Sequence, residues 1–284
     1  MRSSFLVKFR KELSELNNNF SHYIFVWEQF YIDNGALLKK EKTKFTTEIY
    51  PTNSNARQFN VPLSHLDATH QQTYSFILKS TFLLVYSEFE VYMREFYEFA
   101  RKADTSLPNL ALKERVPDDI FEHLKIDPTK FFEKEELLTF DYIRLRRNRL
   151  THSGGQSKGD LADLIRNKGN VLQKFWGKTL FNGTFGINFQ SHETESFNKE
   201  EVFDLINIMR SLINKTDELI CNAIGETGVI ENLQADFIKD NKGKIKSWKN
   251  DKSQSKFKAF CLNEFAFKID KDRLQKIDFI GDIA

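Results

Sequence analysis

Arginine and histidine side chains cluster in one short segment of the chain. Four arginines fall within six residues, and a histidine follows them: Arg144, Arg146, Arg147, Arg149 and His152. Guanidinium groups bind phosphate oxygens and keep their charge at physiological pH, and a histidine with its ordinary pKa of about 6.5 transfers protons near neutrality. The segment therefore carries the side chains that phosphodiester cleavage requires.

A helix is expected to position these side chains. Residues 133–136 are typical of an acidic first turn and Gly154-Gly155 of a helix end, which predicts a helix from about Lys134 to His152. On a straight helix Arg147 and His152 would point about 140° apart. They can act together if the helix unwinds at His152, or if two chains present their motifs to a shared cleft.

The rest of the chain predicts a mainly α fold, because apolar residues recur at helical spacing over most of its length. A first helix is expected at residues 5–30, with Asn34-Gly35 as its stop. Further helices are expected at 69–102, after Gly159, at 199–223 and once more after Gly225. Loop or short-strand structure is expected at residues 37–66, a small β-hairpin at 179–189, a lysine-rich loop at 239–258 and a strand at 257–269. These segments suggest an N-terminal extension (1–66), a helical domain (67–224) and a basic C-terminal extension (225–284).

Composition excludes several classes of protein. The formal net charge of +2 is too small for global attraction to nucleic acid, so a basic site must be local. Cys221 and Cys261 form no Cys-x-x-Cys motif, which argues against a zinc site and against a secreted, disulfide-stapled domain. No apolar run approaches the roughly 20 residues that span a bilayer. We therefore expect a cytoplasmic protein without a metal, a cofactor or a membrane segment.

Two segments resemble one known family. The stretch from Arg147 to His152, with Asn148 in second place, resembles the Arg-x4-His signature of the HEPN superfamily. The stretch from Tyr86 to Tyr92 resembles the aromatic-Glu-x-aromatic segment of the first core helix in bacterial HEPN groups, where Glu90 would occupy an acidic position. The resemblance covers residues 69–223 and implies a HEPN-type helical bundle.

The resemblance also implies a function, namely a metal-independent endoribonuclease that acts as a homodimer and serves as a toxin or antiphage defence effector. Arg147, Asn148 and His152 would then be catalytic, with Glu90, Arg144 and Arg149 in support. Its partners would be an RNA substrate and an antitoxin or defence-system protein. We expect further RNA contacts from Arg146, Lys244, Lys246 and Trp248.

Other interpretations fit the same residues. The motif could be a basic helix end, in which the histidine caps carbonyl groups and the arginines pair with Asp141 and Glu90. The C-terminal lysines could form an ordinary solvated surface. The protein could then be a non-catalytic adaptor that binds RNA or protein, or a regulatory partner of a neighbouring enzyme.

Overall fold

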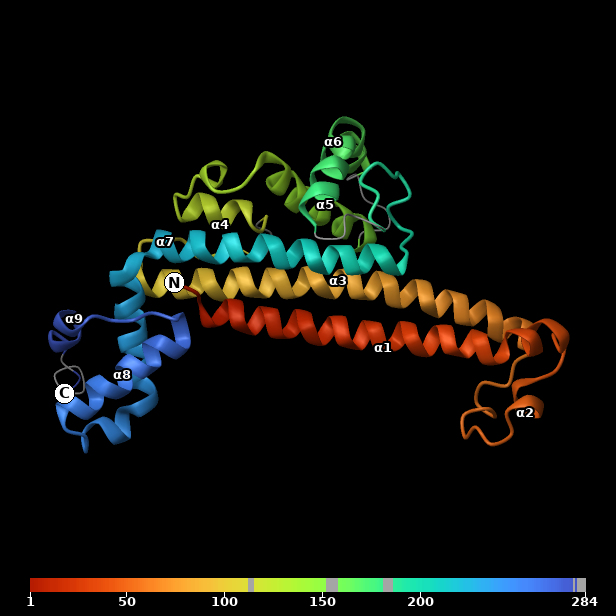
Figure 1. The fold of residues 1–284 in the computed structure, drawn as a ribbon, viewed down its shortest axis with the longest axis horizontal. Coiled ribbons are helices and arrows are strands. Elements are labelled where there is room, and N and C mark those ends of the chain that lie inside the picture. Colours follow the sequence, from red (N-terminus) through yellow and green to blue (C-terminus); the bar gives the residue numbers. More distant parts are fainter. Residues whose placement is uncertain (112–114, 152–157, 181–185, 278, 280–284) are drawn as a thin grey trace. The chain divides into compact units, whose positions relative to one another are not determined.

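The computed structural model describes residues 1–111, 115–151, 158–180, 186–277 and 279. It confirms the mainly α fold, because the described residues form nine α-helices and one short 3-10 helix (Figure 1). Within these ranges no β-strand forms, and the one isolated bridge joins Phe45 to Pro62. None of the described helices is both long and apolar enough to cross a membrane.

The chain divides into two compact units that interleave along the sequence. The first unit comprises Met1–Glu12, Ser87–Phe140 and Ile208–Ala284, and the second comprises Leu13–Tyr86 and Asp141–Asn207. Each unit thus combines segments from several parts of the chain. Four helices contribute residues to both units: α1 (Ser4–Lys40), α3 (Leu63–Ala103), α5 (Lys134–Thr151) and α7 (Lys199–Ile245).

Aromatic packing builds the core of the first unit. The rings of Phe5 and Phe96 stack with centroids 5.1 Å apart, and Phe99 stacks on Phe265 at 4.8 Å. Phe265 belongs to α8 (Asn250–Phe265), and the unit also contains α4 (Asp118–His123), the 3-10 helix (Pro128–Lys130) and α9 (Lys271–Gln275). These contacts join the start of α1, the end of α3 and α8 around one apolar centre.

A buried carboxylate adds a polar anchor to this unit. Asp217 on α7 accepts hydrogen bonds from the backbone amide of Ser3 at 3.0 Å, from the Ser3 hydroxyl and from the Tyr92 hydroxyl at 3.1 Å. Burial raises the pKa of Asp217, although these hydrogen bonds oppose the shift. The side chain therefore ties the chain's first residues to α7 and α3.

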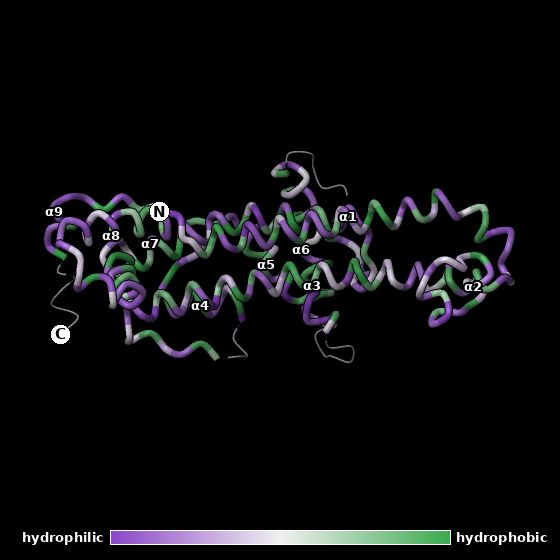
Figure 2. Tube along the Cα trace, turned by 90° about the horizontal axis from the view of Figure 1, so that it is seen from below, coloured by the Kyte–Doolittle hydropathy of each residue, from purple (hydrophilic) through white to green (hydrophobic). Residues whose placement is uncertain are grey.

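The second unit is built around aromatic residues of α1 and α3. The Trp27 ring stacks on His70 at 3.3 Å and on Tyr74 at 4.7 Å, and Phe20 packs against Phe203 at the start of α7. Apolar residues recur between polar ones along both helices (Figure 2), as expected of helices with one buried face. The unit also contains α2 (Thr46–Ile49) and α6 (Lys158–Thr179), whose Trp176 is fully buried.

One helix end was predicted wrongly and another correctly. Asn34-Gly35 does not stop the first helix, which continues to Lys40. The Asn34 side chain donates to the Phe30 carbonyl at 3.0 Å and accepts from the Tyr50 hydroxyl at 2.9 Å, so it stabilises the helix it was expected to end. In α7 the φ of +73° at Gly225 does produce a break, and the stretch before it matches the predicted helix.

The C-terminal region is helical where a loop and a strand were expected. Residues 239–245 complete α7, and Phe257, Cys261 and Phe265 lie four residues apart on the buried face of α8. Their spacing is helical, so the strand prediction was wrong. The predicted hairpin at 179–189 falls partly outside the described residues, and the described ones do not form a strand.

Candidate active site

Helix α5 carries the arginine cluster, and both of its ends are fixed by side chains. At its start Glu136, almost fully buried, accepts from the backbone amide of Glu133 at 2.9 Å and from the Lys215 ammonium at 2.7 Å. At its end the Thr151 hydroxyl lies 3.1 Å from the Arg147 carbonyl. The predicted helix is confirmed as far as Thr151, and His152 lies outside the described residues.

Arg147 and Asn148 form a half-buried pair at the end of this helix. Nη1 of Arg147 donates to Oδ1 of Asn148 at 3.2 Å, and the guanidinium carbon lies 5.5 Å from the centre of the Tyr86 ring. A cation over an aromatic face is attracted to the ring, by about 0.5–1 kcal/mol at exposed sites. Asn148 and the Tyr86 ring thus hold the Arg147 guanidinium in place at the end of α5.

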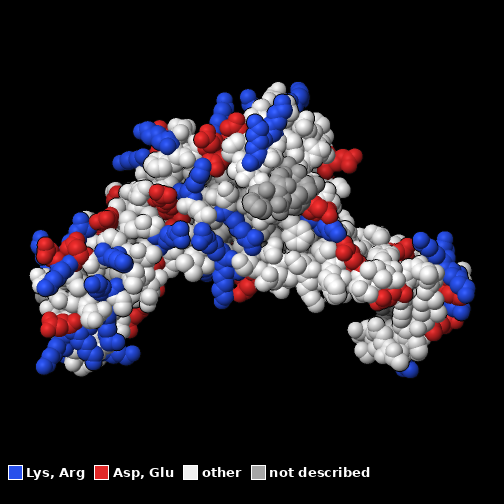
Figure 3. Space-filling model, in the orientation of Figure 1, with Lys and Arg blue, Asp and Glu red and all other residues white. Residues whose placement is uncertain are grey.

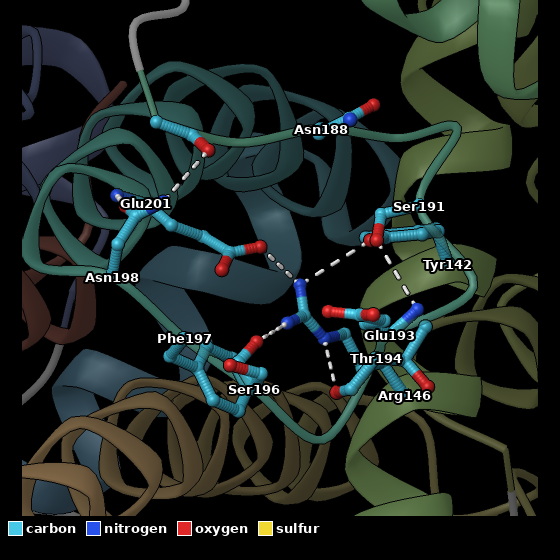
Figure 4. Close-up of a pocket in the computed structure, with 11 residues that line it drawn as sticks. Tyr142, Arg146, Asn188, Ser191, Glu193, Thr194, Ser196, Phe197, Asn198 and Glu201 are labelled. Carbon is cyan, nitrogen blue, oxygen red and sulfur yellow. Dashed lines mark hydrogen bonds and ion pairs between the residues drawn. The ribbon is translucent and has the colours of Figure 1, made fainter.

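The Arg146 side chain points toward Glu201 and the segment before α7 (Figure 4). It is only 2% exposed. Its guanidinium forms an ion pair with Glu201 and donates to the carbonyls of Thr194 at 2.8 Å and Ser196 at 3.0 Å. The Phe197 ring lies 4.0 Å from the guanidinium carbon. The expected RNA contact is not compatible with this position, because a phosphate would have to replace partners that are already buried.

A cavity of about 250 Å³ lies beside this ion pair, lined by Tyr142, Arg146, Glu201 and polar residues of the segment before α7 (Figure 4). The Tyr142 hydroxyl is 3.3 Å from Arg146 Nη1. Burial raises the pKa of Tyr142, and the neighbouring arginine partly opposes that shift. Since Glu201 already neutralises Arg146, the cavity holds no uncompensated positive charge from this arginine.

The remaining two arginines form ion pairs near the surface. Arg144 contacts Asp141 at 2.6 Å, and Arg149 contacts Glu195 at 3.1 Å. The interpretation as a basic helix end predicted the pairing with Asp141, and that pairing is confirmed. The four arginines therefore do not face one anion together.

Glu90, Lys244, Lys246 and Trp248 belong to the first unit, whereas the arginine cluster belongs to the second. Glu90 is half-buried on α3, and its pairing with an arginine of the motif stays a prediction. The two lysines are exposed and Trp248 is half-buried in the turn after α7. Their expected RNA contact is likewise untested.

Sequence reasoning missed Glu201 as a partner of this helix. Asn198 accepts from the Glu201 backbone amide at 2.7 Å, so the pair has the spacing of a helix cap. An acidic residue in a first turn is usually exposed, whereas this one is turned inward to Arg146. A pairing between residues 55 apart leaves no local sequence signal.

Within the part of the chain that the structure describes, no group of three or more His, Cys, Asp or Glu side chains could hold a metal ion. No protein-family model matches the chain, and no similar curated protein or solved structure was found. Function must therefore be inferred from the motif and its geometry.

Proposed function

We propose that the protein is a metal-independent endoribonuclease whose site consists of Arg147, Asn148 and His152. The observation that carries the proposal is the half-buried Arg147–Asn148 pair at the end of α5, held over the Tyr86 ring. The resemblance of residues 147–152 to the HEPN signature supports it further. It also suggests that the protein acts as a toxin or antiphage effector, with an antitoxin or defence-system protein as partner.

The chemistry uses the 2′-hydroxyl of the RNA as the nucleophile. Its oxygen bonds to phosphorus as the bond to the 5′ oxygen breaks, and one proton leaves the 2′-hydroxyl while another reaches the departing oxygen. His152 performs one of these two transfers, and Arg147 stabilises the negative charge that develops on the phosphate oxygens. Asn148 orients the Arg147 guanidinium, to which its amide oxygen is hydrogen-bonded.

A homodimer would allow the arginine of one chain to act with the histidine of the other. Equal amounts of Arg147→Ala and His152→Ala chains should then regain about a quarter of wild-type cleavage after dissociation and remixing. Half of the dimers would be mixed, and each mixed dimer would hold one intact site. If the purified protein is active as a monomer, or if the mixture stays as inactive as its components, the shared site is wrong.

The reaction itself is tested by the ends of its products. Purified protein should cleave single-stranded RNA in EDTA and leave 2′,3′-cyclic phosphate or 3′-phosphate ends, while a substrate with one 2′-deoxy position should stay intact at that position. Loss of cleavage in EDTA, or cleavage next to the deoxynucleotide, would contradict the mechanism.

A second candidate is a binding protein that does not cleave RNA. It is favoured by the burial of Arg146 and by the ion pairs of Arg144 and Arg149, which leave less positive charge at the motif than the sequence suggests. In that case RNA or a partner protein should bind without any change in RNA length.

A further inference from the structure

A second basic surface lies in the first unit. Six exposed lysines, which we name the lysine patch, occupy the end of α7, the following turn and the first half of α8: Lys242, Lys244, Lys246, Lys249, Lys252 and Lys256. Lysine and arginine side chains gather over these elements on the face that Figure 3 shows. Asp251 is the one acidic residue between positions 242 and 256.

The charge of this patch is not neutralised locally. Among the described residues, none of its six ammonium groups forms an ion pair with a carboxylate. Six cations with one acidic residue among them repel one another, and a bound polyanion would relieve that repulsion. The patch therefore favours an anionic partner.

An aromatic ring lies within the patch. Trp248 occupies the turn between α7 and α8, where its backbone amide donates to the Ile245 carbonyl at 3.0 Å. The ammonium groups of Lys252 and Lys256 lie 5.8 and 5.1 Å from the centre of its ring, and Phe237 packs nearby. Because these lysines are four residues apart on α8, they share one face of that helix.

This combination favours single-stranded nucleic acid over an anionic lipid surface. Unpaired bases stack on aromatic rings while their phosphates bind nearby lysines. A membrane-bound helix also needs a face of exposed apolar side chains, and no large hydrophobic residue between positions 242 and 256 is fully exposed. A duplex would offer its phosphates but no free base for the indole.

We propose that the lysine patch and Trp248 bind single-stranded RNA, with a base stacked on the indole and phosphates on the surrounding ammonium groups. RNA is named as the ligand on the strength of the proposed ribonuclease function. The binding itself does not require cleavage. The patch thus gives the protein a means of holding RNA that does not depend on the residues of the motif.

The phosphate contacts are tested by the salt dependence of binding. The probe is a fluorescein-labelled 2′-O-methyl oligouridine of about 12 nucleotides, which has no free 2′-hydroxyl and cannot be cleaved. Each phosphate contact to a single strand contributes about 0.7 to the slope of log K against log salt concentration. Lys252→Gln/Lys256→Gln should reduce the slope by about 1.4. The matched control Lys39→Gln/Lys42→Gln, in exposed lysines of the second unit at and just after the end of α1, should leave it unchanged.

The stacking contact is tested by Trp248→Ala and Trp248→Phe. Loss of a base–aromatic stack should weaken binding about fivefold to a hundredfold in the alanine variant without changing the salt slope, and phenylalanine should restore part of the loss. The proposal is overturned if both variants and the lysine double variant bind like wild type. Binding to anionic phospholipid vesicles without binding of the oligonucleotide would overturn it equally.

The same experiment separates this proposal from the ribonuclease. If the protein binds the uncleavable oligonucleotide through the patch but does not cleave RNA, the RNA-binding proposal stands and the ribonuclease proposal is wrong. If the protein cleaves RNA but the patch variants bind the oligonucleotide like wild type, the ribonuclease proposal stands and the lysine patch is not an RNA-binding site.

Discussion

Replacing Arg146 by methionine should destabilise the second unit strongly. The substitution removes the guanidinium and leaves the Glu201 carboxylate buried with no cation opposite it. Breaking a buried ion pair from one side costs about 3–5 kcal/mol. The carbonyls of Thr194 and Ser196 also lose their hydrogen-bond donor. Both residues line the cavity of about 250 Å³, where water can replace the lost hydrogen bonds. We therefore expect the ion pair to account for most of the loss.

A neighbouring arginine provides the matched control. Arg149 lies on the same helix and also forms an ion pair, but the side chain of its partner Glu195 is 59% exposed. Arg149→Met should therefore cost at most about 1 kcal/mol. The double variant Arg146→Met/Glu201→Met should be more stable than Arg146→Met alone, because it removes the unpaired charge.

Urea unfolding followed by tryptophan fluorescence measures these differences. Trp27 and Trp176 belong to the second unit and Trp248 to the first, so a Trp248→Phe background restricts the signal to the unit that contains Arg146. If Arg146→Met and Arg149→Met lower the free energy of unfolding by similar amounts, Arg146 is not the buried anchor described above.

Three further predictions follow from the buried groups and from the motif. Burial lowers the pKa of His70, so the folded state resists its protonation, and stability should fall as the pH drops below the unfolded pKa of about 6.5. In urea unfolding at several pH values, the free energy of unfolding of His70→Phe should fall less below this pH than that of wild type. An equal fall in both proteins would exclude His70 as its source. Burial raises the pKa of Cys221 and of Cys261 to about 12, so neither thiol should react with Ellman's reagent at pH 8 until denaturant is added. Rapid labelling of the folded protein would contradict their burial. Tyr86→Leu removes the ring beneath Arg147, worth about 1 kcal/mol, and should slow RNA cleavage about fivefold. Tyr86→Phe keeps the ring and should cleave at nearly the wild-type rate, and equal rates for leucine and phenylalanine would exclude the ring's contribution.

Apolar periodicity was enough to predict the long helices, because a helix with one buried face repeats its apolar residues every three to four positions. The prediction failed at the end of the first helix and at α8. Asn34-Gly35 is typical of a helix end, yet the Asn34 side chain forms tertiary and helical hydrogen bonds that keep the helix intact. The aromatic-rich α8 was mistaken for a strand although its buried residues lie four apart.

The arginine cluster shows the same limit at the candidate site. The contact between Arg144 and Asp141 could be predicted, because residues three apart on a helix are neighbours. The burial of Arg146 could not, since its partners come from residues 194–201 and depend on the tertiary fold. Four similar side chains in one segment thus occupy three different environments.

The measurement that tests the central claim most directly is RNA cleavage by wild type, Arg147→Ala and His152→Ala. The controls are Arg166→Ala, an exposed arginine paired with Asp163, and His22→Ala, an exposed histidine on α1. All five proteins should be assayed in EDTA after their folding has been verified by circular dichroism. We predict cleavage by wild type and both controls and none by the two motif variants. Inactive wild type, or motif variants that cleave as well as the controls, would contradict the assignment of the site.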